Sequence, residues 1–267
     1  MFRCLLQNWI VASLHENELK SLLSFAESVA IGAGNITLEY FMKDIEVARK
    51  EDDSPVTIAD RKAEEYVRRR IEAEFPTHSI LGEEEGEKKG ESPYRWIIDP
   101  IDGTQSYIRG VPLYTVLLAL EYEGAPQVGV IHVPHLRETV SAANGVGAFY
   151  NGSQCQISKT KTLAESWVQV TDYADLTRLR PKFAKRLLAE AYSCRAWGDA
   201  YGYLLVATGR VDVMIDPIMN IWDVAPLKPI ITEASGVFTD LDGEGNAIGT
   251  SSVACNSMLH KELMDLI

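Results

Sequence analysis

The sequence predicts a fold in which an α+β half is joined to an α/β half. In the first half of the chain, two segments with helical periodicity precede a series of short apolar runs typical of strands, and after residue 151 strand-like and helix-like segments alternate. A chain of 267 residues is long enough for one large domain or two intimate halves. We therefore expect residues 12–148 and residues 149–267 to form one integrated unit.

Two helices are predicted in the first half. Ser13 and Glu16 have the spacing of a capping box, and apolar residues recur at helical spacing from Leu19 to Ala30 behind them. A second helix is predicted after Asp60, with an apolar face that includes Val67. The basic residues of this helix are expected on its solvated face; they are Arg61, Lys62, Arg68 and Arg69.

Short apolar runs predict the strands, and Gly or Asn residues predict the turns between them. In the first half the predicted strands are 80–81, 96–98, 115–122, 127–133 and 139–143. In the second half, predicted strands and helices alternate: strands at 167–171 and 211–215, and helices at 180–191, 198–208 and 222–234. The last two helices are expected to end near Gly209 and Gly236.

The chain is acidic. It carries 26 Lys and Arg against 38 Asp and Glu, a net charge of −12, which argues against a nucleic-acid or anionic-membrane partner. An anionic substrate would therefore need a cation beneath it. The sequence contains no C-x-x-C pair among its four cysteines, no signal-peptide pattern and no run approaching a membrane span. These features predict reduced thiols and a cytoplasmic protein.

The segment W-I-I-D-P-I-D-G-T at 96–104 is the most informative about chemistry. A buried strand ends at Asp99, and a proline and a glycine then force a turn. This turn can bring the carboxylates of Asp99 and Asp102 and the carbonyl of Ile101 to one point, which is the kind of oxygen cluster that Mg²⁺ prefers. An ordinary Pro/Asp/Gly turn is the structural alternative.

Other residues at element ends could join this cluster. The amides of Gly103 and Thr104 could face a phosphate oxygen if a helix starts there. Glu83 follows a predicted strand, and Asp60 and Asp223 stand near helix starts. The structural alternatives are a solvated acidic loop for Glu83 and a helix N-cap for the two aspartates. Because all these acids stand at element ends, a shared site can form.

Four ordered blocks of the sequence resemble the inositol monophosphatase superfamily. They are K-E-D-D-S-P-V-T-I-A-D at 50–60, G-E-E at 82–84, D-P-I-D-G-T at 99–104, and W-D-V-A at 222–225 with T-E-A-S-G at 232–236. Four blocks in the family order make coincidence negligible. The resemblance implies a layered αβαβα sandwich of the inositol monophosphatase and fructose-1,6-bisphosphatase type. It also implies a homodimer and Mg²⁺-dependent hydrolysis of small phosphomonoesters.

By position, the resemblance implies two or three Mg²⁺ ions per subunit. The implied ligands are oxygen atoms: for one ion Glu83, Asp99 and the Ile101 carbonyl, and for the second ion Asp99, Asp102 and Asp223. Asp60 would contribute through water or to a weaker third ion. Residues 12–148 would then supply most of the metal ligands, and residues 149–267 would supply Asp223 and the substrate contacts.

The physics of the site agrees with this placement. Five converging carboxylates without metal would repel one another strongly, whereas two Mg²⁺ about 4 Å apart would neutralise them and bind both oxygens of an in-line displacement. We expect a water oriented by Glu83 and the Thr104 hydroxyl to attack phosphorus directly. Asp223 would lie near the departing oxygen, and the amides of Gly103 and Thr104 would hold the phosphate.

The segment W-G-D-A-Y-G-Y at 197–203 resembles the histidinol-phosphatase branch more than the inositol branch. Asp199 stands where inositol enzymes generally carry small uncharged residues, and Asp216 has the spacing of an acidic substrate contact. Two extra carboxylates would suit histidinol phosphate, which carries an ammonium and an imidazole. The alternatives are a helix N-cap for Asp199, a strand-end turn for Asp216, and inositol phosphate, a sugar bisphosphate or 3′-phosphoadenosine phosphate as substrate.

Three other interpretations fit the sequence less well. A haloacid-dehalogenase phosphatase needs D-x-D spacing, which the 99–104 block lacks; Asp240 and Asp242 have it but lie where a hairpin turn is expected. A non-enzymatic metal- or phosphate-binding module would lack a ligand, and none of the expected positions is empty. His132 and His135 could place two imidazoles near a zinc ion, but a proline lies between them.

Overall fold

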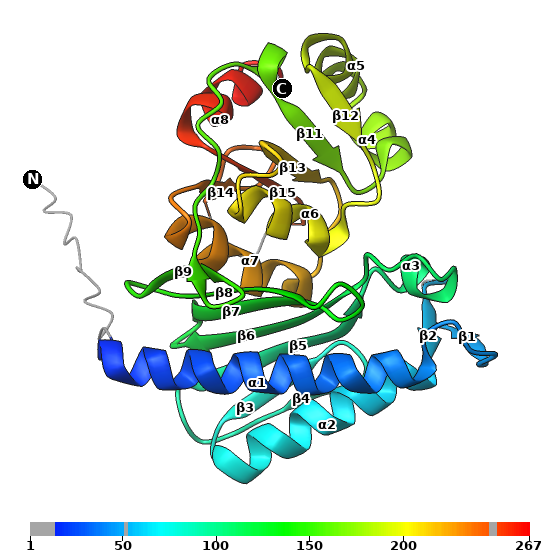
Figure 1. Cartoon of the computed structure of the whole chain (residues 1–267), viewed down its shortest axis with the longest axis vertical. Coiled ribbons are helices and arrows are strands. Elements are labelled where there is room, and N and C mark those ends of the chain that lie inside the picture. The colour runs from blue at the N-terminus through cyan, green and yellow to red at the C-terminus, as the bar shows by residue number, and fades with distance from the viewer. Residues whose placement is uncertain (1–13, 51–52, 246–249) are drawn as a thin grey trace, which may run out of the picture.

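The computed structural model describes residues 14–50, 53–245 and 250–267. Within these ranges the chain forms five layers in the order helices, sheet, helices, sheet, helices (Figure 1). The predicted αβαβα sandwich is therefore confirmed. The expected boundary between residues 148 and 149 falls inside a strand of the first sheet, and two helices of the second half pack against both sheets.

The first sheet has eight strands in the order β10-β9-β8-β7-β6-β5-β3-β4. The strands are β3 Ser79–Gly82, β4 Gly86–Lys88, β5 Tyr94–Asp102, β6 Thr115–Tyr122, β7 Ala125–Val133, β8 Glu138–Ala143, β9 Gly147–Tyr150 and β10 Ser153–Gln154. Only β3 and β5 pair in parallel; the other neighbours are antiparallel. Helices α1 (Glu16–Tyr40) and α2 (Ile58–Glu74) cover its outer face.

The second sheet has five strands in the order β12-β11-β13-β15-β14. They are β11 Trp167–Val170, β12 Ser193–Arg195, β13 Val213–Asp216, β14 Val237–Thr239 and β15 Ser252–Cys255. Helices α6 (Asp199–Ala207) and α7 (Ile221–Glu233) lie between the sheets, and α4 (Tyr173–Leu179), α5 (Pro181–Glu190) and α8 (Ser257–Met264) cover the outer face. The remaining elements are short: β1 Val47–Arg49, β2 Pro55–Thr57, α3 Thr104–Ile108 and a 3₁₀ turn at Leu163–Glu165.

Alternation of side chains along the strands explains the layers. In β6, Val116 and Leu118 pack under α1 and α2, whereas Leu117 between them faces α6 and α7. In β13, Met214 faces the middle helices, and Val213 faces the outer helices of the second sheet. Both sheets are therefore apolar on both faces, which requires helices on each side of each sheet.

The first helix is longer and more apolar than the sequence analysis expected. By length and composition α1 could cross a membrane. Its buried residues, however, form one continuous cluster with the first sheet, so packing accounts for its apolar face (Figure 1). Its N-cap is His15, and Ser13 of the predicted capping box lies outside the described residues.

Most predicted elements are present, with a few corrections. The helix predicted at 222–234 is not the last one, because α8 follows it. Helix α4 was not predicted, and neither were the short strands β1, β2, β4, β9, β10, β12, β14 and β15. Among the described cysteines, Cys155, Cys194 and Cys255 are free thiols, as expected, and Cys4 lies outside the described residues.

Packing of α7 on the first sheet depends on one glycine. A Cβ added at Gly129 in β7 would lie 2.0 Å from the backbone oxygen of Pro226 in α7. We therefore expect Gly129→Ala to lower the free energy of unfolding by about 1–3 kcal/mol, because backbone has to move to relieve the overlap. Chemical denaturation measures this effect. Gly245→Ala is the matched control, since a Cβ there meets nothing within 4 Å, and equal stability of the two variants would contradict the prediction.

Candidate active site

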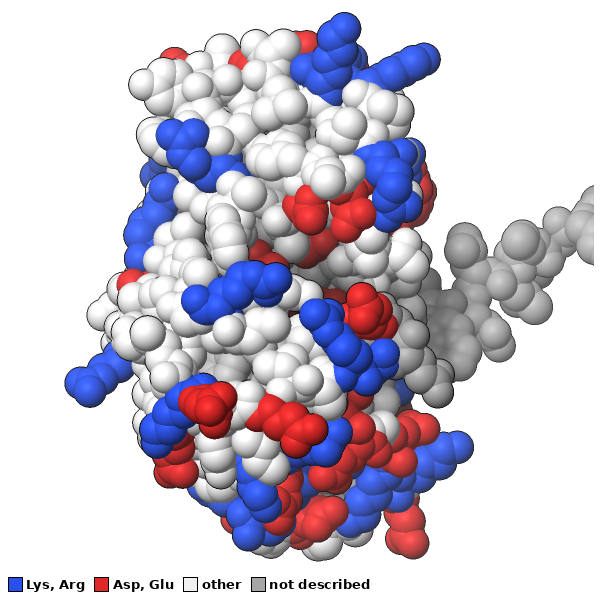
Figure 2. Space-filling model, turned by 90° about the vertical axis from the view of Figure 1, so that its right-hand side faces the viewer, with Lys and Arg blue, Asp and Glu red and all other residues white. Residues whose placement is uncertain are grey.

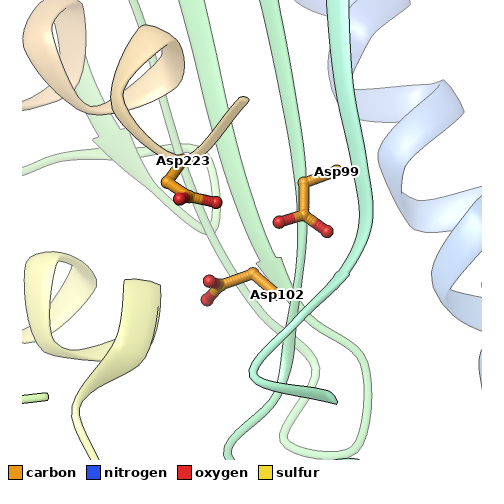
Figure 3. A group of neighbouring side chains, drawn as sticks. All are labelled: Asp99, Asp102 and Asp223. Carbon is orange, nitrogen blue, oxygen red and sulfur yellow. The ribbon is translucent and has the colours of Figure 1, made fainter. Parts of the chain in front are cut away.

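Three carboxylates converge at the end of β5. Asp99, Asp102 and Asp223 each offer an oxygen atom within 4.8 Å of the others, and this is the one group of this kind among the described residues. Figure 3 shows the three side chains pointing toward one another, Asp99 and Asp102 from the end of β5 and Asp223 from the start of α7. The sequence therefore correctly placed these acids, more than 120 positions apart at the extremes, around one point.

The strand β5 continues past Asp99, where the sequence predicted its end, to Asp102, with a shift of register between these two residues. Hydrogen bonds hold this irregular strand end. The amide of Ile101 donates to Asp99 Oδ1 at 3.0 Å, and Thr104 Oγ1 donates to the carbonyl of Ile101 at 3.0 Å. Gly103 has φ = +78°, and a Cβ there would lie 2.8 Å from Asp199 Oδ2. A side chain at position 103 would thus be disfavoured by both backbone conformation and space. The amide of Thr104 opens the short helix α3, as the sequence suggested.

Two of the predicted acids are third residues of helices rather than N-caps. Asp60 Oδ2 accepts hydrogen bonds from the amide and hydroxyl of Thr57 at 2.8 and 2.6 Å, and Asp223 Oδ2 accepts one from the amide of Asn220 at 2.6 Å. Thr57 and Asn220 are the N-caps, so the N-cap alternative for the two aspartates is wrong. The capping box uses one carboxylate oxygen and leaves the other available.

The other carboxylate oxygen of Asp60, Oδ1, is buried and has no hydrogen-bond partner. Burying a carboxylate oxygen without a partner costs free energy, because the oxygen loses its hydrogen bonds to water and forms none in the protein. A cation, or a water bound to a cation, would satisfy this atom.

The raised pKa values of these acids also show that the site lacks positive charge. Burial, reinforced by Glu83, Asp102 and Asp223, raises the pKa of Asp99 well above its usual value. Burial, reinforced by Asp199 and Asp223, does the same to the pKa of Asp102. Burial also raises the pKa of Asp60 and of Asp223 to about 6. Carboxylates in this state are suited to hold hard divalent cations, which need charged oxygen ligands.

Glu83 lies beside this cluster, on the turn between β3 and β4. Its negative charge raises the pKa of Asp60, Asp99 and Asp223. The ammonium of Lys50 donates to both Glu83 Oε1 and Glu84 Oε1 at 2.7 Å. The side chains of Glu83 and Glu84 are 18% and 7% exposed, so these two acids do not lie in a solvated loop, whereas Glu85 is exposed. The contacts of Lys50 were not predicted from the sequence.

A buried ion pair shapes that turn. Arg68 was expected on a solvated face, but it is buried and its guanidinium donates to Glu64 Oε1 at 2.8 Å and to the carbonyl of Gly86. Glu64 in turn accepts the amides of Glu84 and Glu85 at 2.9 and 3.1 Å. The i,i+4 spacing of Glu64 and Arg68 is the sequence signal that could have indicated this pair.

The two acids expected at the substrate lie next to the cluster. Asp199 has Ser106 Oγ at 3.4 Å, and the following amide, that of Ala200, donates to Asp102 Oδ2 at 2.7 Å. Asp216 accepts from Thr171 Oγ1 at 2.7 Å and from the amide of Ile218 at 3.1 Å. These two bonds agree with the strand-end turn that was the alternative for Asp216. Burial raises its pKa to about 7.

The competing sites are not formed in the described residues. His132 is buried and shares a hydrogen bond with Thr139 at 2.8 Å, and the ring of His135 packs against Phe41. Asp240, in the D-x-D sequence, caps a turn after β14 by accepting the amides of Asp242 and Glu244.

The surface near the cluster is hollowed and acidic. Figure 2 shows Asp and Glu side chains gathered in a hollow about midway along the molecule, with Lys and Arg beside it. Carboxylates that converge between the two halves of a layered αβαβα fold, with Asp99 buried and Asp102 and Asp223 half-buried, are suited to a metal-dependent phosphatase.

Comparison with known proteins agrees with this class. The inositol monophosphatase family matches residues 18–267. A histidinol-phosphatase of Chlorobaculum parvum is 44% identical over 250 residues, which cover 92% of this chain and 96% of the relative. A fructose-1,6-bisphosphatase/inositol-1-monophosphatase of Thermotoga maritima is 35% identical over 214 residues, 79% of this chain and 82% of the relative. The crystal structure of the extragenic suppressor protein suhB from Bartonella henselae has a TM-score of 0.87 and 28% identity, covering 92% and 98% of the two chains.

The chain therefore belongs to the inositol monophosphatase family and is a phosphoric monoester hydrolase. The resemblance that the four sequence blocks indicated is confirmed. The layered fold is that of the solved relatives.

Proposed function

We propose that this chain hydrolyses histidinol phosphate to histidinol and phosphate with Mg²⁺ as its cofactor. The observation that carries the metal dependence is the convergence of Asp99, Asp102 and Asp223 within 4.8 Å, together with the orphaned Asp60 Oδ1. The similarity to histidinol-phosphatases, 44% identical in one case, supports the substrate. The enzyme would act in the cytoplasm as a homodimer, on a small phosphorylated metabolite, without a nucleic-acid or membrane partner.

Five carboxylates and one carbonyl would hold the metal ions. They are Asp60, Glu83, Asp99, Asp102 and Asp223, with the carbonyl of Ile101. Bound Mg²⁺ supplies charge neutralisation and polarisation of the phosphoryl group. The ammonium of Lys50 contacts Glu83 Oε1 in the structure, so a metal ion would bind Glu83 through its other oxygen or displace Lys50.

Other groups would act on water and phosphate. The hydroxyl of Thr104 donates to the Ile101 carbonyl and keeps lone pairs to accept a hydrogen bond from the attacking water. The carboxylate of Glu83 would accept the other proton of that water and so orient it in line with the leaving oxygen. The amides of Gly103 and Thr104 would donate to the phosphate. Asp199 would contact the cationic part of the substrate, with Asp216 adding negative charge nearby.

Inositol 1-phosphate is the alternative substrate. The Thermotoga maritima relative, whose name includes inositol-1-monophosphatase, favours this substrate; it is 35% identical over 79% of this chain. The acidic Asp199 argues against it, since an uncharged polyol needs mixed donors and acceptors rather than a carboxylate beside the metal ligands.

Phosphate release tests the proposal. We expect the purified protein to release phosphate from histidinol phosphate at least about tenfold faster, in kcat/KM, than from inositol 1-phosphate, fructose 1,6-bisphosphate or 3′-phosphoadenosine 5′-phosphate. Chelation of divalent ions should abolish the release, and added Mg²⁺ should restore it. Faster turnover of inositol 1-phosphate would overturn the substrate, and full activity after chelation would overturn the cofactor.

A further inference from the structure

A cavity of about 550 Å³ opens beside the acidic cluster. It is bounded by α3, by the segment around the start of α4 and by the turn before α6; the lining includes Ser106, Asp172, Tyr173, Asp175, Trp197 and Asp199. Three of the residues described as lining it are aspartates, and none is Lys or Arg. The cavity meets the cluster at Asp199, whose carboxylate lies next to Gly103 and whose charge raises the pKa of Asp102.

The turn before α6 has an unusual backbone. Trp197 and Asp199 have φ of +67° and +35°, values that side-chain-bearing residues rarely adopt. Between them Gly198 packs so closely on β13 that an added Cβ would lie 2.7 Å from Met214 Cε. Gly198 thus packs against Met214, and the two flanking residues lie at the cavity in left-handed conformations. Strain of this kind persists where a ligand-binding geometry requires it.

The side chains that line the cavity have complementary chemistry. The Trp197 side chain lines the cavity although it is 47% exposed, an unusual position for a large aromatic residue. Asp172 caps α4 through one oxygen, Oδ1, which accepts the amide of Ala174 at 2.6 Å. Asp175 is paired with Arg178 at 2.7 Å, so the charges of Asp172 and Asp199 dominate the wall. An aromatic ring beside carboxylates attracts a cation. The same carboxylates repel a second phosphate group, because both are negatively charged.

We infer that Trp197, together with Asp172, is a specificity-determining element that binds the positively charged part of the leaving group and excludes bisphosphates. The inference deepens the proposed function and rests on it. It assigns the cation contact to an aromatic side chain and to the N-cap residue of α4, beyond Asp199 and Asp216. It also accounts for how one acidic cavity distinguishes an amine-bearing phosphate ester from a sugar bisphosphate.

Binding of the dephosphorylated product tests this inference without relying on turnover. Calorimetry would measure histidinol, which carries an ammonium, and inositol, which carries no charge, on the Mg²⁺-loaded protein with saturating inorganic phosphate. We expect histidinol to bind wild type more tightly than inositol. Trp197→Leu should raise the Kd of histidinol about tenfold, the scale of one desolvated cation–π contact. Asp172→Asn should raise it similarly, and Trp197→Phe should retain most of the affinity.

Trp167→Leu is the matched control. Trp167 is also a large exposed aromatic residue, 43% exposed, on β11 outside the cavity lining, and this variant should leave the Kd of histidinol unchanged. An unchanged Kd in Trp197→Leu, or equal binding of histidinol and inositol to wild type, would overturn the inference. Failure of the proposed function has a different signature: histidinol would bind in the Trp197-dependent way, but histidinol phosphate would not be the fastest substrate.

Discussion

Asp99→Asn is expected to lower kcat by about three orders of magnitude or more. Asp99 is fully within the cluster, 2% exposed, and its pKa is raised by the burial and by the neighbouring acids that converge on it. In the proposed site it is the carboxylate shared by both metal ions. Loss of that ligand removes several kcal/mol of charge stabilisation from the transition state, and about 1.4 kcal/mol corresponds to a factor of ten in rate.

A second measurement separates this effect from misfolding. Because the substitution removes one of several repelling charges, we expect the Mg²⁺-free variant to melt at the same temperature as wild type or higher. Added Mg²⁺ should raise the melting temperature of wild type but not that of the variant. Asp242→Asn, at an exposed acid paired with Arg180, is the control and should behave as wild type in both assays. Near-wild-type kcat in Asp99→Asn would refute the role assigned to Asp99.

The architecture could be predicted because its signals are local and redundant. The eight-residue run at 115–122 is apolar on both faces, and the structure places it as β6 between two layers of helices. The acids at 99, 102 and 223 could be placed together because each stands near a recognisable end or start of an element. The sequence did not show the exact position of Asp60 and Asp223 at the helix start: both are the third residues of their helices, three positions after the N-cap.

The contacts that escaped prediction are polar, and most of them join residues far apart in the sequence. Arg68 is of a residue type that usually lies on the surface. Its burial with Glu64 is favourable because the β3–β4 turn lies over α2 and its amides also bind Glu64. Lys50 reaches Glu83 across 33 positions of sequence. Trp197 has a left-handed φ beside Gly198, which packs on Met214 of a strand 16 positions further along the chain. Periodicity reports which face of an element is apolar, and it carries no information about such pairings.

The stability of the metal-free protein should fall as the pH rises from about 4 to 7. Burial raises the folded-state pKa of Asp60 and Asp223 to about 6 and that of Asp216 to about 7, whereas in the unfolded chain these groups titrate near 3.8. Between these limits the folded protein holds protons that the unfolded chain has released. The free energy of unfolding therefore decreases with increasing pH, on the order of 3 kcal/mol for a group shifted by about two pH units.

Mg²⁺ should reverse this trend, because the ion binds the deprotonated carboxylates and so stabilises the folded protein more at pH 8 than at pH 5. Thermal melts from pH 5 to 8, with chelator or with Mg²⁺, would measure both effects. Asp223→Asn makes the comparison specific: its amide oxygen can still accept the bond from Asn220 that Asp223 accepts now, but it cannot ionise. The variant should show a shallower loss of stability with pH and a smaller gain from Mg²⁺. If the stability of wild type and of Asp223→Asn depended on pH in the same way, with chelator and with Mg²⁺, the proposal that the cation neutralises the acids around Asp223 would be wrong.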